Sequence, residues 1–145
     1  MKTSEIKLRY VRKSTGIKVC SSADVEKAFR NFWDKDSIDY CETFAVMYLS
    51  RSHEVLGIMK VSEGGLDACL VDARKIFQGA LLANASSIIL AHNHPSGSLN
   101  PFSPDLKITY ELSQAATFLK IKVLDHFIHT SDTYSIFADE GYLQN

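Results

Sequence analysis

The feature that constrains this chain most is a short apolar run that ends in two histidines. Residues 87–91 read Ser-Ile-Ile-Leu-Ala and are followed by His92, Asn93 and His94. The run has the length and the β-branched content of a strand buried on both faces, which is typical of α/β proteins. Pro95 then stops the strand and starts a turn.

Two side chains of this strand end are expected to meet a third group. Residues two apart on a strand point the same way, so His92 and His94 aim their rings at one point while Asn93 faces away. Asp105 follows at the start of an expected helix. Two ring nitrogens and a carboxylate leave a fourth position open, which is the catalytic pattern for zinc. The sequence therefore predicts a hydrolytic metal centre with His92, His94 and Asp105 as ligands.

Each of these residues has a structural alternative. The histidines could be strand-end rings that hydrogen-bond to backbone, and Asp105 could be a first-turn acid that complements the helix dipole. Asp105, however, shares the helix face of Ile108 and Leu112. An unpaired carboxylate on a buried face is costly, which favours the metal.

The remaining patterns predict one α/β domain. The chain has 145 residues, of which 46% are apolar and 23% charged, as in an ordinary globular protein. Strands are expected over residues 5–11, 44–49, 55–61, 66–71, 123–128 and 133–137. Helices are expected after Ser21 or Ser22, from Asp72 to Asn84, and over about residues 104–119 with Ser103 as N-cap and an inward stripe of Ile108, Leu112, Ala115 and Leu119. Residues 123–128 should run parallel to 87–92, because a helix connects the two strands.

Composition also limits the partners. The 16 Lys and Arg residues balance 17 Asp and Glu residues, so net charge gives no support for a nucleic-acid surface. Neither a signal peptide nor a membrane-spanning run is evident, so we expect a cytoplasmic protein without a membrane partner. Cys20, Cys41 and Cys69 have no paired spacing and are expected to be free buried thiols.

A hydrolytic centre also needs a base to take a proton from water. Glu42 precedes the strand at residues 44–49, but from spacing alone it is barely better than Glu54 or Glu63. Ser96 has no base placed to activate it, so it is expected to shape the loop.

The other histidines have different expected roles. Asp125 and His126 lie on an apolar strand and are expected to be a structural pair, or to orient metal-bound histidines, rather than to be ligands. His53 and His129 are expected at the surface, in a turn and at a strand end.

The motif closely resembles the RadC-like branch of the JAB/MPN (JAMM) metalloprotease superfamily. The resemblance rests first on residues 88–97, Ile-Ile-Leu-Ala-His-Asn-His-Pro-Ser-Gly, with Asn100-Pro101 and Asp105. It extends over about residues 38–143 and includes Glu42-Thr43-Phe44, Val61-Ser62, Gly64-Gly65, Ile76-Phe77, residues 80–85, residues 122–126 and residues 135–141.

The resemblance implies a fold and a set of roles. The fold would be a cytidine-deaminase-like α/β sandwich, a mixed sheet flanked by about three helices. Residues 38–145 would form the RadC-like domain. The residue patterns, rather than the resemblance, give residues 1–37 as a strand and a helix packed on its core. His92, His94 and Asp105 match the family's zinc ligands, and its upstream glutamate matches Glu42, which favours Glu42 as the base.

Two departures from the family pattern stand out. The family has a serine three residues before the ligand aspartate, implied to help hold the oxyanion, whereas this chain has Phe102 there and Ser103 one step later. Either the loop slips so that Ser103 substitutes, or the donor is missing, a loss that typically costs about a hundred- to a thousand-fold in rate. Longer relatives also carry an N-terminal helix-hairpin-helix module, which residues 1–37 do not resemble.

The function predicted from these residues is a zinc-dependent peptidase or isopeptidase acting on a peptide or protein. A zinc-bound water would attack the amide carbonyl, with Glu42 as general base. One alternative is a DNA repair or recombination factor, as the family label suggests, although charge does not support nucleic-acid binding. Another is a catalytically weak scaffold for protein contacts, for which Phe102 is the best argument.

Overall fold

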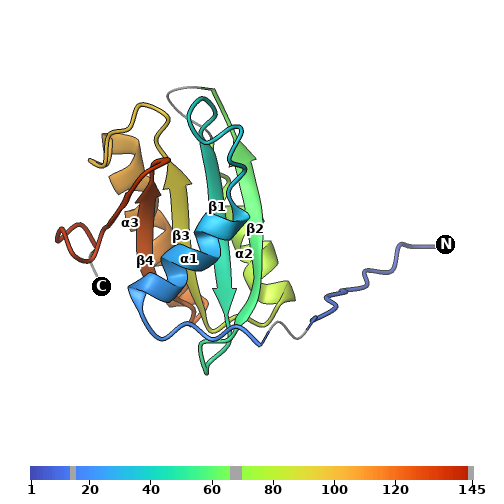
Figure 1. Cartoon of the computed structure of the whole chain (residues 1–145). Coiled ribbons are helices and arrows are strands. Elements are labelled where there is room, and N and C mark those ends of the chain that lie inside the picture. The colour runs from blue at the N-terminus through green and yellow to red at the C-terminus, as the bar shows by residue number, and fades with distance from the viewer. Residues whose placement is uncertain (14–15, 66–69, 144–145) are drawn as a thin grey trace.

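The protein is described by a computed structural model that covers residues 1–13, 16–65 and 70–143. It contains five strands and three helices in these residues (Figure 1). In chain order the elements are α1 (Ser22–Phe32), β1 (Thr43–Leu49), β2 (Val55–Glu63), α2 (Ala73–Leu82), β3 (Ser87–Asn93), α3 (Ser103–Phe118), β4 (Lys122–His129) and β5 (Tyr134–Ile136). The expected α/β class, with a mixed sheet and three helices, is confirmed.

The sheet brings the beginning of β1 next to the end of β3. The strand order is β2-β1-β3-β4-β5, and β1 runs antiparallel to both β2 and β3. Strands β3 and β4 are parallel, as expected of two strands joined by a helix. In the β1–β3 register Phe44 lies opposite His92, so the residue that precedes β1 reaches the sheet edge where β3 ends.

Helices cover both faces of the sheet. Helices α2 and α3 lie on one face and α1 on the other (Figure 1). Strand β1 serves both layers, because Phe44, Val46 and Tyr48 pack with α2 and α3 while Ala45 and Met47 pack with α1. All seven residues of β3 are buried as well, as the apolar run predicts.

Helix α1 forms where its pattern predicts it. Ser21 is the N-cap, and its hydroxyl accepts a hydrogen bond from the Asp24 N–H while the Asp24 carboxylate accepts one from the Ser21 N–H. Val25, Phe29 and Trp33 are buried against the sheet. Arg30 on the same helix donates to the carbonyls of Thr130 and Thr133, which ties α1 to the β4–β5 turn.

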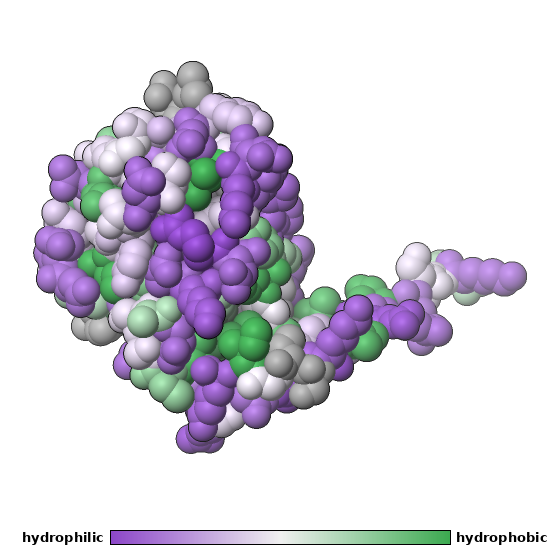
Figure 2. Space-filling model, in the orientation of Figure 1, coloured by the Kyte–Doolittle hydropathy of each residue, from purple (hydrophilic) through white to green (hydrophobic). Residues whose placement is uncertain are grey.

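The strand expected over residues 5–11 is wrong. This segment forms no strand, and Ile6 and Leu8 are exposed where it extends away from the domain (Figures 1 and 2). An alternating pattern makes a strand only when a neighbouring edge accepts its backbone groups. The edge contact is made instead by Ile17 and Val19, through bonds of the Ile17 carbonyl with the Val55 N–H and of the Val19 N–H with the His53 carbonyl.

The start of α3 differs by one residue from the expectation. Phe102 rather than Ser103 is the N-cap, and the Asp105 carboxylate accepts the Phe102 N–H at 2.7 Å. The inward stripe is also shifted, since the fully buried positions are Thr109, Leu112 and Ala116 and Leu119 is exposed. A helix of this pitch brings Thr109 onto the Leu112 face, which its polar character hides in the sequence.

Other expectations have mixed outcomes. Asp72 caps α2 as predicted, and Asn84 follows that helix in a left-handed conformation at φ 55°. The strand expected over residues 66–71 falls mostly outside the described residues, and Leu70 and Val71 are not in a strand. Cys20 is exposed and Cys41 half-buried, so the expectation of buried thiols is wrong for Cys20, while Cys69 lies outside the described part. Within the described residues, no helix combines the length and apolar content needed to cross a bilayer.

Candidate metal centre

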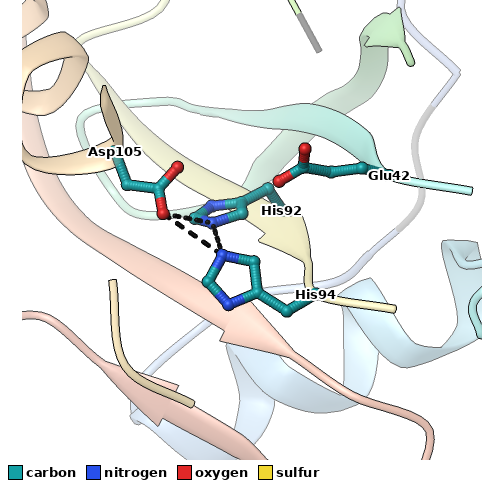
Figure 3. Close-up of side chains that lie close together, drawn as sticks. All are labelled: Glu42, His92, His94 and Asp105. Atoms are coloured by element: carbon teal, nitrogen blue, oxygen red, sulfur yellow. Dashed lines mark hydrogen bonds and ion pairs between the residues drawn. The ribbon is translucent and has the colours of Figure 1, made fainter. Parts of the chain in front are cut away.

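Four ionisable side chains from three separate segments converge at the end of β3. Glu42, His92, His94 and Asp105 each place one ligand atom within 4.8 Å of the others (Figure 3). The Nε2 atoms of His92 and His94 are 2.9 Å apart, and they lie 3.3 and 3.2 Å from Asp105 Oδ2. All four are residues that the sequence singled out.

The fold explains why these residues meet. His92 is on β3 and His94 just beyond it, so both rings point to the α3 side of the sheet. The His94 N–H donates to the His129 carbonyl, which extends the β3–β4 pairing by one residue. Asp105 comes from the first turn of α3, and Glu42 directly precedes β1, the antiparallel neighbour of β3.

The spacing of the donor atoms fits a metal ion. Nitrogen and oxygen ligands lie about 2.0–2.1 Å from a tetrahedral zinc ion, which places ligand atoms about 3.3 Å apart. The three separations among His92, His94 and Asp105 lie at or just below that value. Two imidazoles and one carboxylate are also a donor set that zinc accepts. The cluster could therefore bind a metal ion.

The charges within the cluster favour a cation. Burial opposes ionisation of Asp105, but the rings of His92 and His94, with Nε2 atoms 3.3 and 3.2 Å from Oδ2, outweigh it and hold the pKa of this carboxyl well below its usual range. Burial lowers the pKa of His92. For His94 burial acts in the same direction, but the hydrogen bond to Asp105 outweighs it and raises the pKa. A carboxylate that stays ionised beside two rings is suited to a positive ion.

Groups behind the rings fix their orientation. His94 Nδ1 lies 2.9 Å from the Ser98 carbonyl, and His92 Nδ1 lies 2.7 Å from His126 Nε2. His126 thus contacts a candidate ligand from behind, as its strand position suggested. Asp125 points elsewhere and accepts the N–H groups of His126 and Ala138.

Asn93 supports the candidate site in a way that the sequence analysis missed. It faces away from the cluster as expected, but its buried amide accepts the Thr43 N–H at 2.7 Å and donates to the carbonyls of Ile38 and Cys41, each at 2.8 Å. These three bonds hold both sides of Glu42 in place. The asparagine between the two candidate ligand histidines could have indicated this role, because a buried amide needs hydrogen-bond partners.

Phe102 lies beside the cluster, whereas Ser103 does not. The Phe102 ring stacks on the His94 ring with centroids 4.4 Å apart, and 42% of the residue is exposed. It lines a pocket of about 240 Å³ together with Glu42, Phe44, Val71, Pro104, Asp105 and Ile108, among others. Ser103 is exposed at the first position of α3 and does not line this pocket.

The placement of His129 corrects a sequence expectation. It is fully buried rather than at the surface, between Phe29 of α1 and Trp33 just after that helix on one side and the rings of Phe127 and Tyr134 on the other. Neither of its ring nitrogens has a hydrogen-bond partner among the described residues. Burial next to the Arg30 guanidinium lowers the pKa of His129 to about 3. His53 is exposed, as expected.

Comparison with known proteins adds a family. Residues 19–142 match the RadC-like JAB domain. Similar proteins include the UPF0758 proteins of Flavobacterium johnsoniae, 42% identical over 69% of this chain and 44% of the relative, and of Desulfitobacterium hafniense, 42% identical over 70% and 45%. The UPF0758 protein of Methanosarcina acetivorans is 34% identical over 88% of this chain and 54% of the relative. The chain thus spans about half the length of these relatives.

Proposed function

The chain belongs to the RadC-like JAB domain family, and from this membership and the geometry of its candidate metal centre we propose that it is a zinc-dependent peptidase or isopeptidase. The observation that carries the proposal is the convergence of His92, His94 and Asp105 at mutual distances of 2.9–3.3 Å, with Glu42 beside them. Three protein ligands leave the fourth position of a tetrahedral ion open to water or substrate.

The chemistry divides between the ion and the protein. A zinc ion held by His92, His94 and Asp105 would lower the pKa of a water molecule to about 7 and would polarise the substrate carbonyl. The Glu42 carboxylate accepts the proton of the attacking water, and the new carbon–oxygen bond forms at the amide carbonyl. Glu42 then returns the proton to the amide nitrogen as the carbon–nitrogen bond breaks. The 4% exposure of Glu42 keeps bulk water from competing for that proton.

The pocket beside the centre supports a peptide substrate with a large apolar side chain next to the cleaved bond. Its apolar wall is formed by Phe44, Val71, Phe102 and Ile108, and Glu42 and Asp105 connect it to the cluster. Burial of an apolar side chain there gives binding energy next to the reacting amide. Lys107 and Glu111, which also line the pocket, offer polar partners for the peptide backbone.

The decisive experiment is Glu42→Gln. Purified wild-type protein and variant are loaded with zinc, and metal content and cleavage of a quenched-fluorescent peptide library are measured. We expect about one zinc per chain in both proteins and turnover only in the wild type, because glutamine cannot accept the proton. Glu63→Gln is the matched control, since Glu63 is an exposed acid paired with Lys60 and should be dispensable. Full turnover by the Glu42 variant would show that Glu42 is not the general base. A wild-type protein that binds no zinc would contradict the proposal of a zinc-dependent hydrolase.

A second candidate function is a protein-binding domain without catalysis. Phe102 favours it, because this apolar ring stacks on His94 at the position where the family motif has a serine. Stoichiometric zinc without cleavage of any library member would support this second function over the peptidase.

A further inference from the structure

We propose that Thr109 and His126 are positioning residues that fix the proton of His92 on Nδ1, so that its Nε2 presents a lone pair to the metal centre. The inference rests on the proposed role of His92 as a ligand. It follows from a chain of hydrogen bonds that begins in the backbone of α3 and ends at the centre.

The chain begins with an unambiguous donor. Thr109 Oγ1 lies 2.6 Å from the carbonyl oxygen of Asp105, one turn earlier in α3. A carbonyl oxygen can only accept, so the threonine hydroxyl proton is directed to Asp105. The same Oγ1 lies 2.6 Å from His126 Nδ1, and its only remaining capacity is to accept. His126 therefore carries its proton on Nδ1.

The assignment then passes from His126 to His92. A neutral imidazole has one N–H, so His126 Nε2 is an acceptor. Its neighbour at 2.7 Å is His92 Nδ1, which must be the donor in this bond. With its proton on Nδ1, His92 has a bare lone pair on Nε2, the atom that lies 2.9 Å from His94 Nε2 and 3.3 Å from Asp105. At each step, only one nitrogen of the neutral imidazole can carry the proton.

The surroundings prevent the rings from turning to another arrangement. Thr109, His126 and His92 are exposed by 2%, 0% and 1%, so water does not compete for their hydrogen bonds. Phe137 stacks on His126 at 4.3 Å, and Phe44 lies parallel to the His92 ring at 6.0 Å. Helix α3 supplies both the ligand Asp105 and, one turn later, the hydroxyl that sets the tautomer of a second ligand.

Without the Thr109 hydroxyl, the series of hydrogen bonds from Thr109 to His92 would no longer fix which nitrogen of each histidine carries the proton. In Thr109→Val, His126 Nδ1–H would be buried without an acceptor, which favours the tautomer with the proton on Nε2. That proton would point at His92 Nδ1 and push the His92 proton to Nε2. A protonated Nε2 cannot bind metal. Groups that orient metal-bound histidines typically account for about 10- to 100-fold in metal affinity.

The test compares three variants of the full chain by two measurements. Zinc affinity is measured by competition with a chromophoric chelator, and the tautomers of the histidines are read in zinc-free protein from nitrogen–proton correlation spectra of the imidazoles. We expect Thr109→Val to weaken zinc binding at least tenfold and to shift His92 and His126 toward the Nε2–H form. Thr109→Ser keeps the hydroxyl and should preserve both properties. Thr117→Val is the matched control. Thr117 lies about two turns further along α3, and its hydroxyl makes the same type of bond, to the Ser113 carbonyl, without a bond to a histidine.

Two results would overturn the proposal. One is a wild-type spectrum with the His92 proton on Nε2, a measurement that needs no variant and so does not depend on whether Thr109→Val folds. The other is a folded Thr109→Val protein with wild-type zinc affinity and wild-type tautomers. If the wild type binds no zinc at all, the proposed function fails, but the zinc-free spectrum still decides whether the hydrogen-bond chain sets the tautomer.

Discussion

Asn93 shows how one residue can serve the centre from the opposite face of the sheet. Its neighbours His92 and His94 point to α3, while its own amide points to the α1 side and binds the segment around Glu42. The donor and acceptor atoms of this amide all have partners. The proposed base and two of the proposed ligands are therefore held together by three consecutive residues at the end of β3.

We predict that Asn93→Asp destabilises the protein by about 2–4 kcal/mol at neutral pH, although the two side chains have the same shape. The carboxylate keeps the acceptor for the Thr43 N–H but faces the carbonyls of Ile38 and Cys41 with a second oxygen, where the amide had a donor. Urea unfolding measures the loss. Asn100→Asp, at an exposed loop position, is the control and should change stability by less than about 0.5 kcal/mol. Equal stability of the two variants would mean that the donor bonds contribute little.

A substitution of Phe102 tests whether the protein lacks the hydrogen-bond donor for the oxyanion that the serine of the family motif is implied to provide. We expect Phe102→Ser to raise kcat at least tenfold with unchanged zinc content, because a hydroxyl at that position can donate to the developing oxyanion. Ser103→Ala should leave kcat unchanged, since Ser103 is exposed and lies outside the pocket. Steady-state kinetics on one cleaved peptide measures both variants. A drop in kcat for Ser103→Ala with no gain for Phe102→Ser would instead assign the donor role to Ser103.

Helix α1 is held on the sheet by a small set of contacts. Its inner side packs on the sheet through Val25, Phe29 and Trp33, and the Phe29 ring contacts those of Phe127 and His129. Arg30 adds bonds to the β4–β5 turn. Its docking therefore rests on a small apolar face and one cation.

We predict that Phe29→Ala lowers the free energy of unfolding by about 3–5 kcal/mol. Phe29 is fully buried, and its loss leaves a cavity between α1 and β4. Chemical denaturation measured by circular dichroism tests the value. Phe118→Ala is the comparison, because Phe118 at the end of α3 is 89% exposed and its truncation should cost less than about 0.5 kcal/mol. A loss below about 1 kcal/mol for Phe29→Ala would show that α1 contributes little to the core.

Local patterns were sufficient for most elements but not for those that depend on a partner. The stripe of α1, the Asp72 cap and the apolar run of β3 each carry their own periodicity, and each element forms where it was predicted. Residues 5–11 have an equally regular alternation but form no strand, whereas the start of β2 and the turn before it bond to Ile17 and Val19. The local periodicity of a segment does not reveal which distant segment it pairs with.

The candidate site was likewise predictable from the sequence only where a local pattern indicates its residues. His92 and His94 follow from strand geometry, and Asp105 from the helix face it shares, whereas Glu42 needed the family resemblance because spacing left Glu54 and Glu63 open. The bonds from Thr109 to His126 and from His126 to His92 join residues 17 and 34 positions apart. Such contacts arise only once α3 lies against β4, so no local pattern reveals them.

For the whole molecule, buried His129 predicts how stability depends on pH. Its pKa is lowered from 6.5 to about 3 by burial, so the folded protein keeps it neutral while the unfolded chain binds a proton below about pH 6.5. Stability therefore falls as the pH falls from 6.5 toward 3, by up to about 1.4 kcal/mol per pH unit for this one group. Buried His126, whose pKa burial also lowers, adds to the same trend.

We expect His129→Gln to have a shallower decrease of stability between pH 7 and 5 than the wild type. Urea unfolding at several pH values gives the two slopes, and this range avoids the titration of most carboxylates. His53→Gln, at an exposed turn, should keep the wild-type slope. The same slope in wild type and His129→Gln would show that His129 is protonated in the folded state or titrates alike in both states.

The antiparallel course of β1 has a practical consequence for handling the protein. Glu42 directly precedes this seven-residue strand, and the exposed turn with Arg51 and Ser52 follows its other end, at least about 24 Å away at about 3.4 Å per residue. A fluorophore, an affinity handle or a covalent link to a solid support attached at that turn would point away from the chemistry. The molecule can thus be immobilised or labelled there with the candidate metal centre left accessible, even to a partner as large as a protein.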